Sequence, residues 1–228
     1  MEPDRSADEI GRLSRTLIEM SDTITEARLS LESQVRERTE QLNSLVNLDA
    51  LTQIYNRRGF EEKFAAPRRR AEEAERPDGL MLIDIDNFKD VNDTAGHAAG
   101  DRVVIEVARR LTAALRRVDV CARWGGDEFI VLVRECTPQG LSQVAGALNE
   151  MMAKLPIVLP DGEAIAVTIS VGAVLLEPED GLALAADMAD AALYTAKQDG
   201  RDRVVIFDRS PLDRALDAEG DPQLVRAD

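Results

Sequence analysis

The chain has 228 residues, 44% of them hydrophobic, and a formal net charge of −15 at pH 7. This length suits one domain of ordinary size plus an extension. The negative charge disfavours nonspecific binding to DNA, RNA or anionic lipid, because those partners select basic surfaces. No apolar run approaches the roughly 20 residues needed to cross a bilayer, and no signal peptide is evident, so we expect no membrane segment in this chain. Cys121 and Cys136 lack metal-ligand spacing, which predicts buried free thiols in a reduced, cytoplasmic setting.

The first part of the chain has the pattern of a coiled coil. From Ile10 to Leu31 apolar residues alternate at spacings of three and four. Two consecutive steps of four then lead to Val35, a stutter that locally unwinds a supercoil. A helix over residues 7–48 would be roughly 60 Å long. We therefore expect it to pair with a second copy and make the protein a homodimer.

Beyond Asp49 helical and strand periods alternate, with a single hairpin among helical crossovers. This order predicts an α+β fold with a five-stranded mixed sheet flanked by helices. The acidic residues 209–228 predict a disordered tail. The predicted strands are 80–86, 118–123, 129–133, 164–176 and 203–207, and the predicted helices are 59–75, 100–117, 139–154 and 182–198.

Two pairs of acids lie beside predicted strands. Asp84 and Asp86 end an apolar strand, where alternation places them on one face, and Asp127 and Glu128 lie at the predicted hairpin. Carboxylates packed together repel unless a cation neutralises them. Oxygen ligands suit Mg²⁺, which also bridges phosphates. The two pairs together predict a magnesium site, although acids at one strand end, taken alone, are as typical of a solvated terminus.

Gly125 and Gly126 lie at the tip of the predicted hairpin. Because glycine adopts conformations closed to residues with a Cβ, this pair suits a tight turn that a bound nucleotide can approach. The run from Gly125 to Phe129 reads Gly-Gly-Asp-Glu-Phe and resembles the signature of the GGDEF family, the diguanylate cyclases. The resemblance extends from about Asp49 to Phe207. It implies a fold of nucleotide-cyclase or ferredoxin-like type.

The resemblance also implies a metal centre. Asp84, the backbone carbonyl of Ile85 and Asp127 would bind metal, and Glu128 would join the site and help to activate the attacking hydroxyl. Two Mg²⁺ ions are expected in each active half-site, with Mn²⁺ as a possible substitute. Such ions polarise an α-phosphate, stabilise a pyrophosphate leaving group and lower the pKa of a ribose 3′-hydroxyl.

Residues 87–101 resemble the family segment that follows the first metal acid. By position, Phe88 and Lys89 would contact phosphates, the former through its backbone, and Asn92 and Asp101 would read the guanine edge. An amide and a carboxylate match the donors and acceptors of that edge. Asp101 is also well placed as an N-terminal residue of the following helix, and both roles can hold together.

Residues 193–201 resemble the end of the family's last helix. The resemblance implies that Lys197 and Arg201 bind the triphosphate, although cations at a helix C-terminus are also stabilising by themselves. Asp202 stands where the family usually has Asn, which leaves the hydrogen bonds of that position open.

Residues 51–60 match the entry motif of the domain, with Gln53 where Gly is usual. We expect Asn56 and Arg58 to anchor the preceding linker there. Arg116 and Asp119 resemble the family's inhibitory site, in which Arg grips phosphate or guanine and Asp accepts from guanine. The structural alternative is a helix-end cation followed by a strand-starting acid. The resemblance implies inhibition by the product, cyclic di-GMP.

Residues 8–13 resemble the opening of the second helix of a HAMP domain, a relay that usually follows a membrane span. A plain dimerising coiled coil is the alternative. We thus expect a signalling helix at 1–48, a GGDEF domain at 49–208 and a tail at 209–228. They would form a piece of a longer sensor, on the cytosolic side of the inner membrane if that sensor spans it.

The expected activity is condensation of two GTP molecules into cyclic di-GMP with release of two pyrophosphates. A two-fold dimer suits a symmetric product made from two identical substrates. A domain that only senses GTP or cyclic di-GMP is the second hypothesis. A dimerising helix with an inert cap is the third.

Overall fold

The computed structural model describes residues 47–65, 76–159 and 162–209. All of them belong to one compact unit that begins at Asn47. The predicted coiled coil, the HAMP-like segment and the tail after Arg209 lie outside the described residues.

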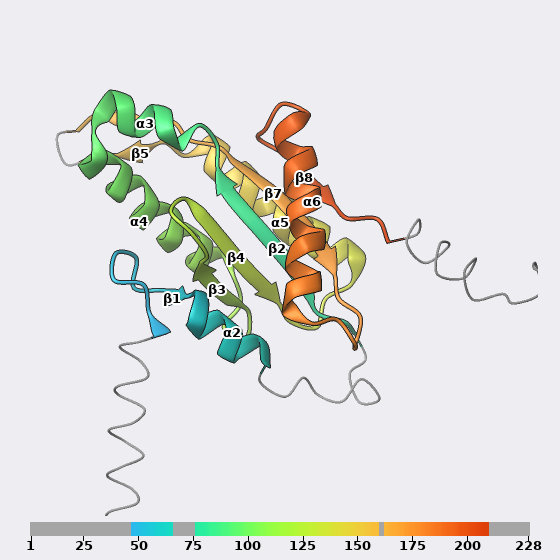
Figure 1. The fold of residues 1–228 in the computed structure, drawn as a ribbon. Coiled ribbons are helices and arrows are strands. Elements are labelled where there is room, and N and C mark those ends of the chain that lie inside the picture. The colour runs from blue at the N-terminus through green and yellow to red at the C-terminus, as the bar shows by residue number, and fades with distance from the viewer. Residues whose placement is uncertain (1–46, 66–75, 160–161, 210–228) are drawn as a thin grey trace, which may run out of the picture. The chain divides into compact units, whose positions relative to one another are not determined.

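A six-stranded mixed sheet forms the centre of the unit, with strand order β1-β3-β4-β2-β7-β8 (Figure 1). The inner strands are antiparallel, whereas the edge strands β1 and β8 pair in parallel with β3 and β7. β5 and β6 form a separate two-stranded sheet. The bounds are β1 (Tyr55–Asn56), β2 (Gly79–Ile85), β3 (Val120–Arg123), β4 (Glu128–Val133), β5 (Ile157–Val158), β6 (Ala164–Ile165), β7 (Ile169–Leu175) and β8 (Val204–Ile206).

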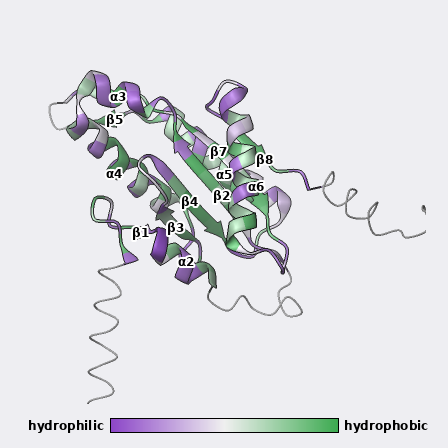
Figure 2. Cartoon of the chain, viewed as in Figure 1, coloured by the Kyte–Doolittle hydropathy of each residue, from purple (hydrophilic) through white to green (hydrophobic). Residues whose placement is uncertain are grey.

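Helices cover both faces of the sheet. They are α2 (Arg57–Ala65), α3 (Phe88–Ala95), α4 (His97–Ala114), α5 (Pro138–Lys154) and α6 (Leu182–Gln198). Every residue of β2 is buried, because its side chains enter a core on each face. Met81 and Ile83 pack with α4 and α5, and Leu80 and Leu82 pack with α2 and α6. Figure 2 shows this arrangement as hydrophobic residues concentrated in the central strands. The predicted α+β fold with helices flanking a mixed sheet is confirmed.

Several element bounds differ from the prediction. The sheet has a sixth strand, β1, which is too short to leave a periodic pattern. The single strand predicted over 164–176 is divided, because β6 pairs with β5 whereas β7 belongs to the main sheet. α3 was not predicted, since none of its eight residues is fully buried. α4 covers His97–Ala114 rather than 100–117.

The two cysteines are buried and free, as predicted. Burial raises the pKa of Cys121 to about 12 and that of Cys136 to about 11, so both remain thiols at neutral pH. Within residues 47–65, 76–159 and 162–209, none of the helices has the length and hydropathy to cross a membrane.

Candidate active site

The predicted metal acids meet where β2 ends beside the start of β4. Asp84 and Glu128 are directly opposed in the antiparallel pair. The carbonyl of Asp127 accepts a hydrogen bond from the Ile85 N–H at 3.3 Å. Burial raises the pKa of Asp84, the ion pair with Lys197 opposes this, and the charges of Asp127 and Glu128 add to it. The two neighbouring strands thus bring three carboxylates within electrostatic reach of one another.

Lys197 supplies the cation closest to Asp84. Its Nζ lies 2.7 Å from Asp84 Oδ2, because the last turn of α6 reaches the end of β2. A single ammonium cannot balance three carboxylates, so the cluster keeps negative charge. No group of three or more acidic, histidine or cysteine side chains in the described part of the chain has the geometry of a preassembled metal centre. The donors are nevertheless hard oxygens next to surplus negative charge, which fits a divalent cation.

The backbone of Ile85 has the orientation that its predicted role requires. The N–H of the next residue, Asp86, donates to the Thr168 carbonyl at 3.0 Å, on the β7 side of β2. A trans peptide directs its C=O opposite to its N–H. The Ile85 carbonyl therefore points toward β4, where Asp127 and Glu128 lie.

The two glycines of the hairpin have different surroundings. Neither Gly125 nor Gly126 has a positive φ, so the turn does not need a conformation reserved for glycine in the left-handed region. A Cβ at Gly125 would lie 2.7 Å from Glu128 Oε2, whereas a Cβ at Gly126 would have no neighbour within 4 Å. The first glycine makes room for the Glu128 carboxylate. The second leaves open space on the tip of the hairpin.

Arg123, which the sequence analysis did not predict as a site residue, fixes this turn by hydrogen bonds. Its guanidinium donates to the Gly125 carbonyl at 3.1 Å and to the Gly126 carbonyl at 2.7 Å. It also pairs with Asp49 at 3.1 Å. Burial raises the pKa of Asp49, but hydrogen bonds from Thr52 and Arg123 leave it below its ordinary value. The hairpin is thereby tied to the segment through which the chain enters the domain.

The entry motif is anchored mainly as predicted. Asn56 caps α2 by accepting the Gly59 N–H at 3.0 Å, and its amide donates to the Leu48 carbonyl at 3.1 Å. Arg58 is exposed, and the neighbouring Arg57 instead stacks on Trp124, 4.3 Å from the ring centroid.

The predicted nucleotide-binding residues lie on α3 and α4. Phe88 and Lys89 are the first two residues of α3, and unpaired N–H groups at a helix start suit phosphate. A Cβ at Gly100 would collide with Asn92 Oδ1, so the Asn92 amide lies against α4 next to Asp101. Because α4 begins at His97, Asp101 lies beyond its first turn. The helix-dipole explanation for Asp101 is therefore weaker than the sequence suggested.

Asp86 does not share a site with Asp84, contrary to the prediction. β2 ends at Ile85, and the carboxylate of Asp86 accepts hydrogen bonds from Thr168, Ser170 and the backbone of Asp202. Alternation along the strand could not reveal this, because β2 ends at Ile85, one residue earlier than the predicted strand.

The predicted inhibitory pair is closed on itself. Arg116 donates to Asp119 through Nη2 at 2.9 Å and Nε at 3.1 Å. Asp119 also accepts the backbone N–H groups of Arg116 and Arg134, and only 1% of its side chain is exposed. In this state the carboxylate has the structural role that the sequence left as the alternative.

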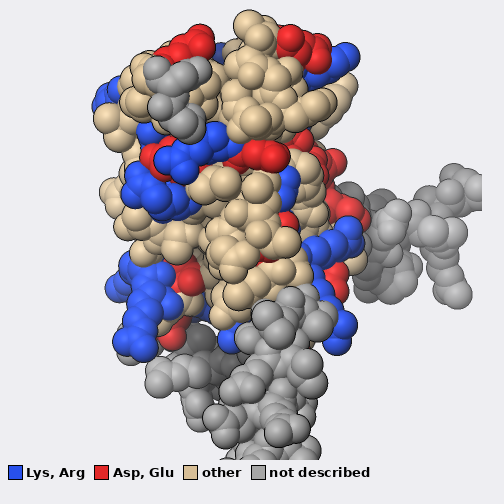
Figure 3. Space-filling view, turned by 90° about the vertical axis from the view of Figure 1, so that its left-hand side faces the viewer, with Lys and Arg blue, Asp and Glu red and all other residues tan. Residues whose placement is uncertain are grey.

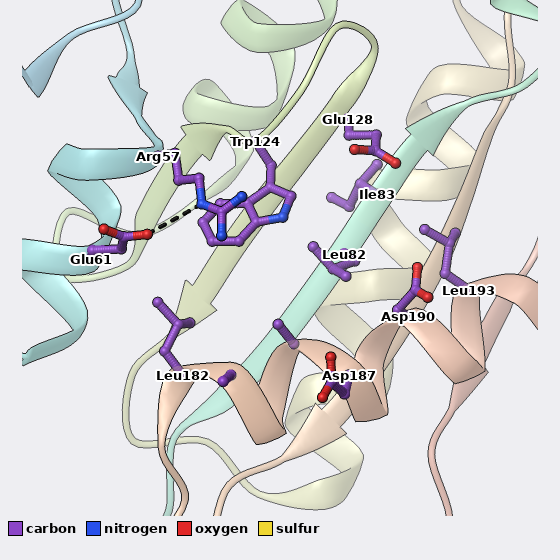
Figure 4. A pocket seen from close by; sticks show the side chains of 12 residues that line it. Arg57, Glu61, Leu82, Ile83, Trp124, Glu128, Leu182, Asp187, Asp190 and Leu193 are labelled. Carbon is purple, nitrogen blue, oxygen red and sulfur yellow. Dashed lines mark hydrogen bonds and ion pairs between the residues drawn. The ribbon is translucent and has the colours of Figure 1, made fainter.

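A cavity of about 530 Å³ lies between α2 and α6, beside the hairpin. Figure 4 shows Glu128 at one end, Leu182 at the other, and Trp124 under Arg57 between them. Its lining contains Glu128 but neither Asn92 nor Asp101, so it is distinct from the predicted guanine site. On the face shown in Figure 3, acidic and basic side chains are interspersed.

Comparison with known proteins identifies the family. Residues 46–203 match the model "Diguanylate cyclase, GGDEF domain". The chain is 38% identical over 170 residues to the uncharacterized protein YhcK of Bacillus subtilis, covering 72% of this chain and 46% of YhcK. It is 33% identical over 165 residues to diguanylate cyclase DosC of Escherichia coli, covering 72% of this chain and 36% of DosC. The chain thus spans less than half the length of both relatives.

A solved structure of a GGDEF domain has a similar fold. The coiled coil and GGDEF domain of DgcB from Caulobacter crescentus, in complex with c-di-GMP, matches with a TM-score of 0.70 and 29% identity, over 79% of this chain and 98% of that one. The chain therefore belongs to the GGDEF family of diguanylate cyclases, a class of nucleotidyltransferases. Enzymes of this family generally use divalent metal ions.

Proposed function

We propose that this protein condenses two GTP molecules into cyclic di-GMP and releases two pyrophosphates. The observation that carries the proposal is the convergence of Asp84, Asp127 and Glu128 beside Lys197, in a chain of the GGDEF family. The presence of every one of these side chains favours turnover over the alternative, a domain that only senses GTP or cyclic di-GMP.

In this proposal different residues of the chain bind different parts of the nucleotide. Asn92 and Asp101 bind the guanine edge and so fix the orientation of the base. The N–H groups of Phe88 and Lys89 bind phosphate oxygens at the start of α3, and the open space at Gly126, next to Gly125, lets the nucleotide approach the hairpin.

The triphosphate would be bound by Lys197 and Arg201, and the metal by Asp84, Asp127, Glu128 and the Ile85 carbonyl. We propose two Mg²⁺ ions per half-site, with Mn²⁺ able to replace them. When bound, the metal supplies positive charge at the α-phosphate and at the leaving pyrophosphate. Glu128 lies at the hairpin tip, where it could accept the proton of a 3′-hydroxyl.

Chemical balance requires two half-sites. The 3′-oxygen of each GTP forms a bond to the α-phosphorus of the other, the bond to the β-phosphate breaks, and each hydroxyl loses its proton. Two domains that face each other across a two-fold axis supply this arrangement. We propose that residues 1–48 dimerise as a coiled coil and hold the domains at high effective concentration. Orientation of this kind can contribute about 7 to 11 kcal/mol.

We also propose that cyclic di-GMP inhibits the enzyme by binding Arg116 and Asp119. Because Asp119 is buried and paired with Arg116, the product has to open this pair before the carboxylate can accept from guanine. The free energy needed to break this ion pair therefore weakens the binding of the product.

The function is tested by incubating the protein with GTP and Mg²⁺ and separating the nucleotides. We expect cyclic di-GMP and pyrophosphate in a one-to-two ratio, with activity per chain rising as the protein concentration increases and dimers form. Asp127→Ala should make no product. Glu150→Gln, which removes an exposed carboxylate on α5 that pairs with Lys154, is the matched control and should retain activity. GTP binding without turnover in the wild type would instead support the sensing hypothesis.

A further inference from the structure

Asp86 is buried next to the candidate active site without belonging to its acid cluster. Only 5% of the residue is exposed. Its Oδ1 accepts from Ser170 Oγ at 2.6 Å. Its Oδ2 accepts from Thr168 Oγ1 at 2.7 Å and from the Asp202 N–H at 3.0 Å. Three donors satisfy a carboxylate that would otherwise be costly to bury.

The Asp202 N–H belongs to the loop between α6 and β8, where the backbone is strained. Gly200, Arg201 and Asp202 have φ values of 113°, 60° and 48°. For a residue with a Cβ, the left-handed region costs about 1 to 2 kcal/mol. Contacts with the rest of the domain have to hold such a loop. Asp86 supplies one from inside the domain, and Asn149 Nδ2 supplies another by donating to Asp202 Oδ1 at 3.1 Å.

The loop matters because Arg201 lies in it. Lys197, the other predicted triphosphate cation, is on α6 and pairs directly with Asp84, so helix packing sets its position. Arg201 lies beyond the end of α6, and its N–H donates to the Ala196 carbonyl of that helix at 3.0 Å. On its other side the backbone continues into Asp202, whose N–H is bound by the buried carboxylate.

We propose that Asp86 is a positioning residue for the triphosphate: it binds the Asp202 N–H and thereby fixes the backbone that presents Arg201. The inference rests on the proposed function, which gives Arg201 its role toward the triphosphate. It assigns the second acid of the Asp84–Asp86 pair to phosphate recognition rather than to metal binding.

The test compares binding of two nucleotides that lack the attacking hydroxyl, 3′-deoxyGTP and 3′-deoxyGMP, in the presence of Mg²⁺. Asp86→Ala should weaken 3′-deoxyGTP binding about tenfold, the loss expected for one charge-assisted contact. Binding of 3′-deoxyGMP should change less than about twofold, because it lacks the β- and γ-phosphates. Arg201→Ala should behave in the same way. The double variant should bind no more weakly than Arg201→Ala alone, since both changes remove the same contact, that of Arg201 with the triphosphate.

Two further variants separate positioning from general stability. Asp86→Asn keeps an oxygen that can accept the Asp202 N–H and should restore 3′-deoxyGTP affinity. Ser170→Ala removes another hydrogen bond of the same carboxylate but leaves the loop contact, so its affinity should match the wild type. If Asp86→Ala does not fold, Gly200→Ala decides, because a Cβ at a φ of 113° strains the same loop from its exposed side.

Equal loss of affinity for both nucleotides in Asp86→Ala, or additive losses in the double variant, would overturn the inference. So would unchanged 3′-deoxyGTP affinity in Gly200→Ala. A wild type that binds 3′-deoxyGTP but makes no cyclic di-GMP from GTP would refute the proposed function while leaving this test intact. A wild type that binds neither nucleotide would refute both.

Discussion

The two ends of the β3–β4 hairpin both carry acids, but they differ in how completely the charge is neutralised. At the tip, Asp127 and Glu128 lie near Asp84, and Lys197 is the cation paired with that group. At the open end, Asp119 is paired with Arg116 and accepts two backbone N–H groups.

A second ion pair at the open end is also neutralised. Arg134 donates to Asp78 at 2.8 Å, and Asp78 also accepts the N–H of Glu135. Two carboxylates therefore meet two guanidinium groups. Both ends were predicted as ligand sites, yet only at the open end does each of these carboxylates have its own guanidinium partner. Surplus negative charge indicates a site for a cation, whereas balanced charge indicates a structural corner, which the product has to open in order to bind.

The largest expected effect is at the tip. Asp84→Asn keeps the shape of the side chain but removes the charge that we propose binds metal. Turnover of GTP should fall by about a thousandfold or more, the scale of losing metal-centred charge stabilisation. Initial rates of cyclic di-GMP formation, with Glu150→Gln as the reference, measure it. Near-normal turnover in this variant would remove Asp84 from the metal site.

A substitution at the open end should act on stability instead. Asp119→Ala leaves two backbone N–H groups without the buried carboxylate that accepts from them and removes the partner of the exposed Arg116, which should lower the free energy of unfolding by about 2 kcal/mol. Urea denaturation at pH 7 measures the change. A loss below about 0.5 kcal/mol, the range of ordinary surface substitutions, would mean that this corner is not structural.

Product inhibition sharpens the comparison further. Arg116→Ala keeps the Asp119 carboxylate but removes the proposed grip on cyclic di-GMP. The concentration of cyclic di-GMP that halves the initial rate should rise about tenfold, as expected for one lost charge-assisted contact. The uninhibited rate of the same variant serves as its own reference. An unchanged inhibition curve would show that product acts elsewhere.

The pH dependence of stability should also report on the acid cluster at the tip. Because the pKa of Asp84 is raised in the folded state, its ionisation opposes folding. That penalty grows as pH rises from the ordinary value of 3.8 through the raised pKa and is complete above it. Asp84→Asn should therefore be more stable than the wild type at pH 7, and the difference should shrink at acid pH. Thermal unfolding across that range checks the sign; a variant that is less stable at pH 7 would contradict it.

Much of the fold was predictable because burial imposes periodicity. β2 and β4 are long and apolar, and α5 and α6 have a clear buried face, so each was placed to within a residue or two. β1 has two residues, and α3 buries none of its residues fully, so neither produced a detectable pattern.

Within the candidate site, residue types were easier to predict than partners. Adjacent acids predicted the cluster of Asp84 with Asp127 and Glu128. Arg123 was missed, because its contacts with Asp49 and the glycine carbonyls depend on tertiary proximity rather than spacing. Asp86 was predicted to share a face with Asp84, because the predicted strand ran to residue 86. The strand β2 ends at Ile85, and Asp86 turns toward other partners.

The smallest expected effect is in the entry turn. Gln53 stands where Gly is usual in the family and has a φ of 60°, with its side chain donating to the Ala50 carbonyl at 2.9 Å. Gln53→Gly relieves the left-handed strain but loses that hydrogen bond, so we expect a stabilisation of at most about 1 kcal/mol. Thermal unfolding measures it. A clear destabilisation would mean that the side-chain contact outweighs the strain.

Divalent-ion binding tests most directly whether the acids at the tip are completed by metal. Mn²⁺ would be titrated into the wild type and into Asp84→Asn, each with 3′-deoxyGTP bound, and the bound ions counted by electron paramagnetic resonance. We predict two ions per wild-type chain and loss of tight binding in the variant. Equal stoichiometry and affinity in both proteins would contradict the account.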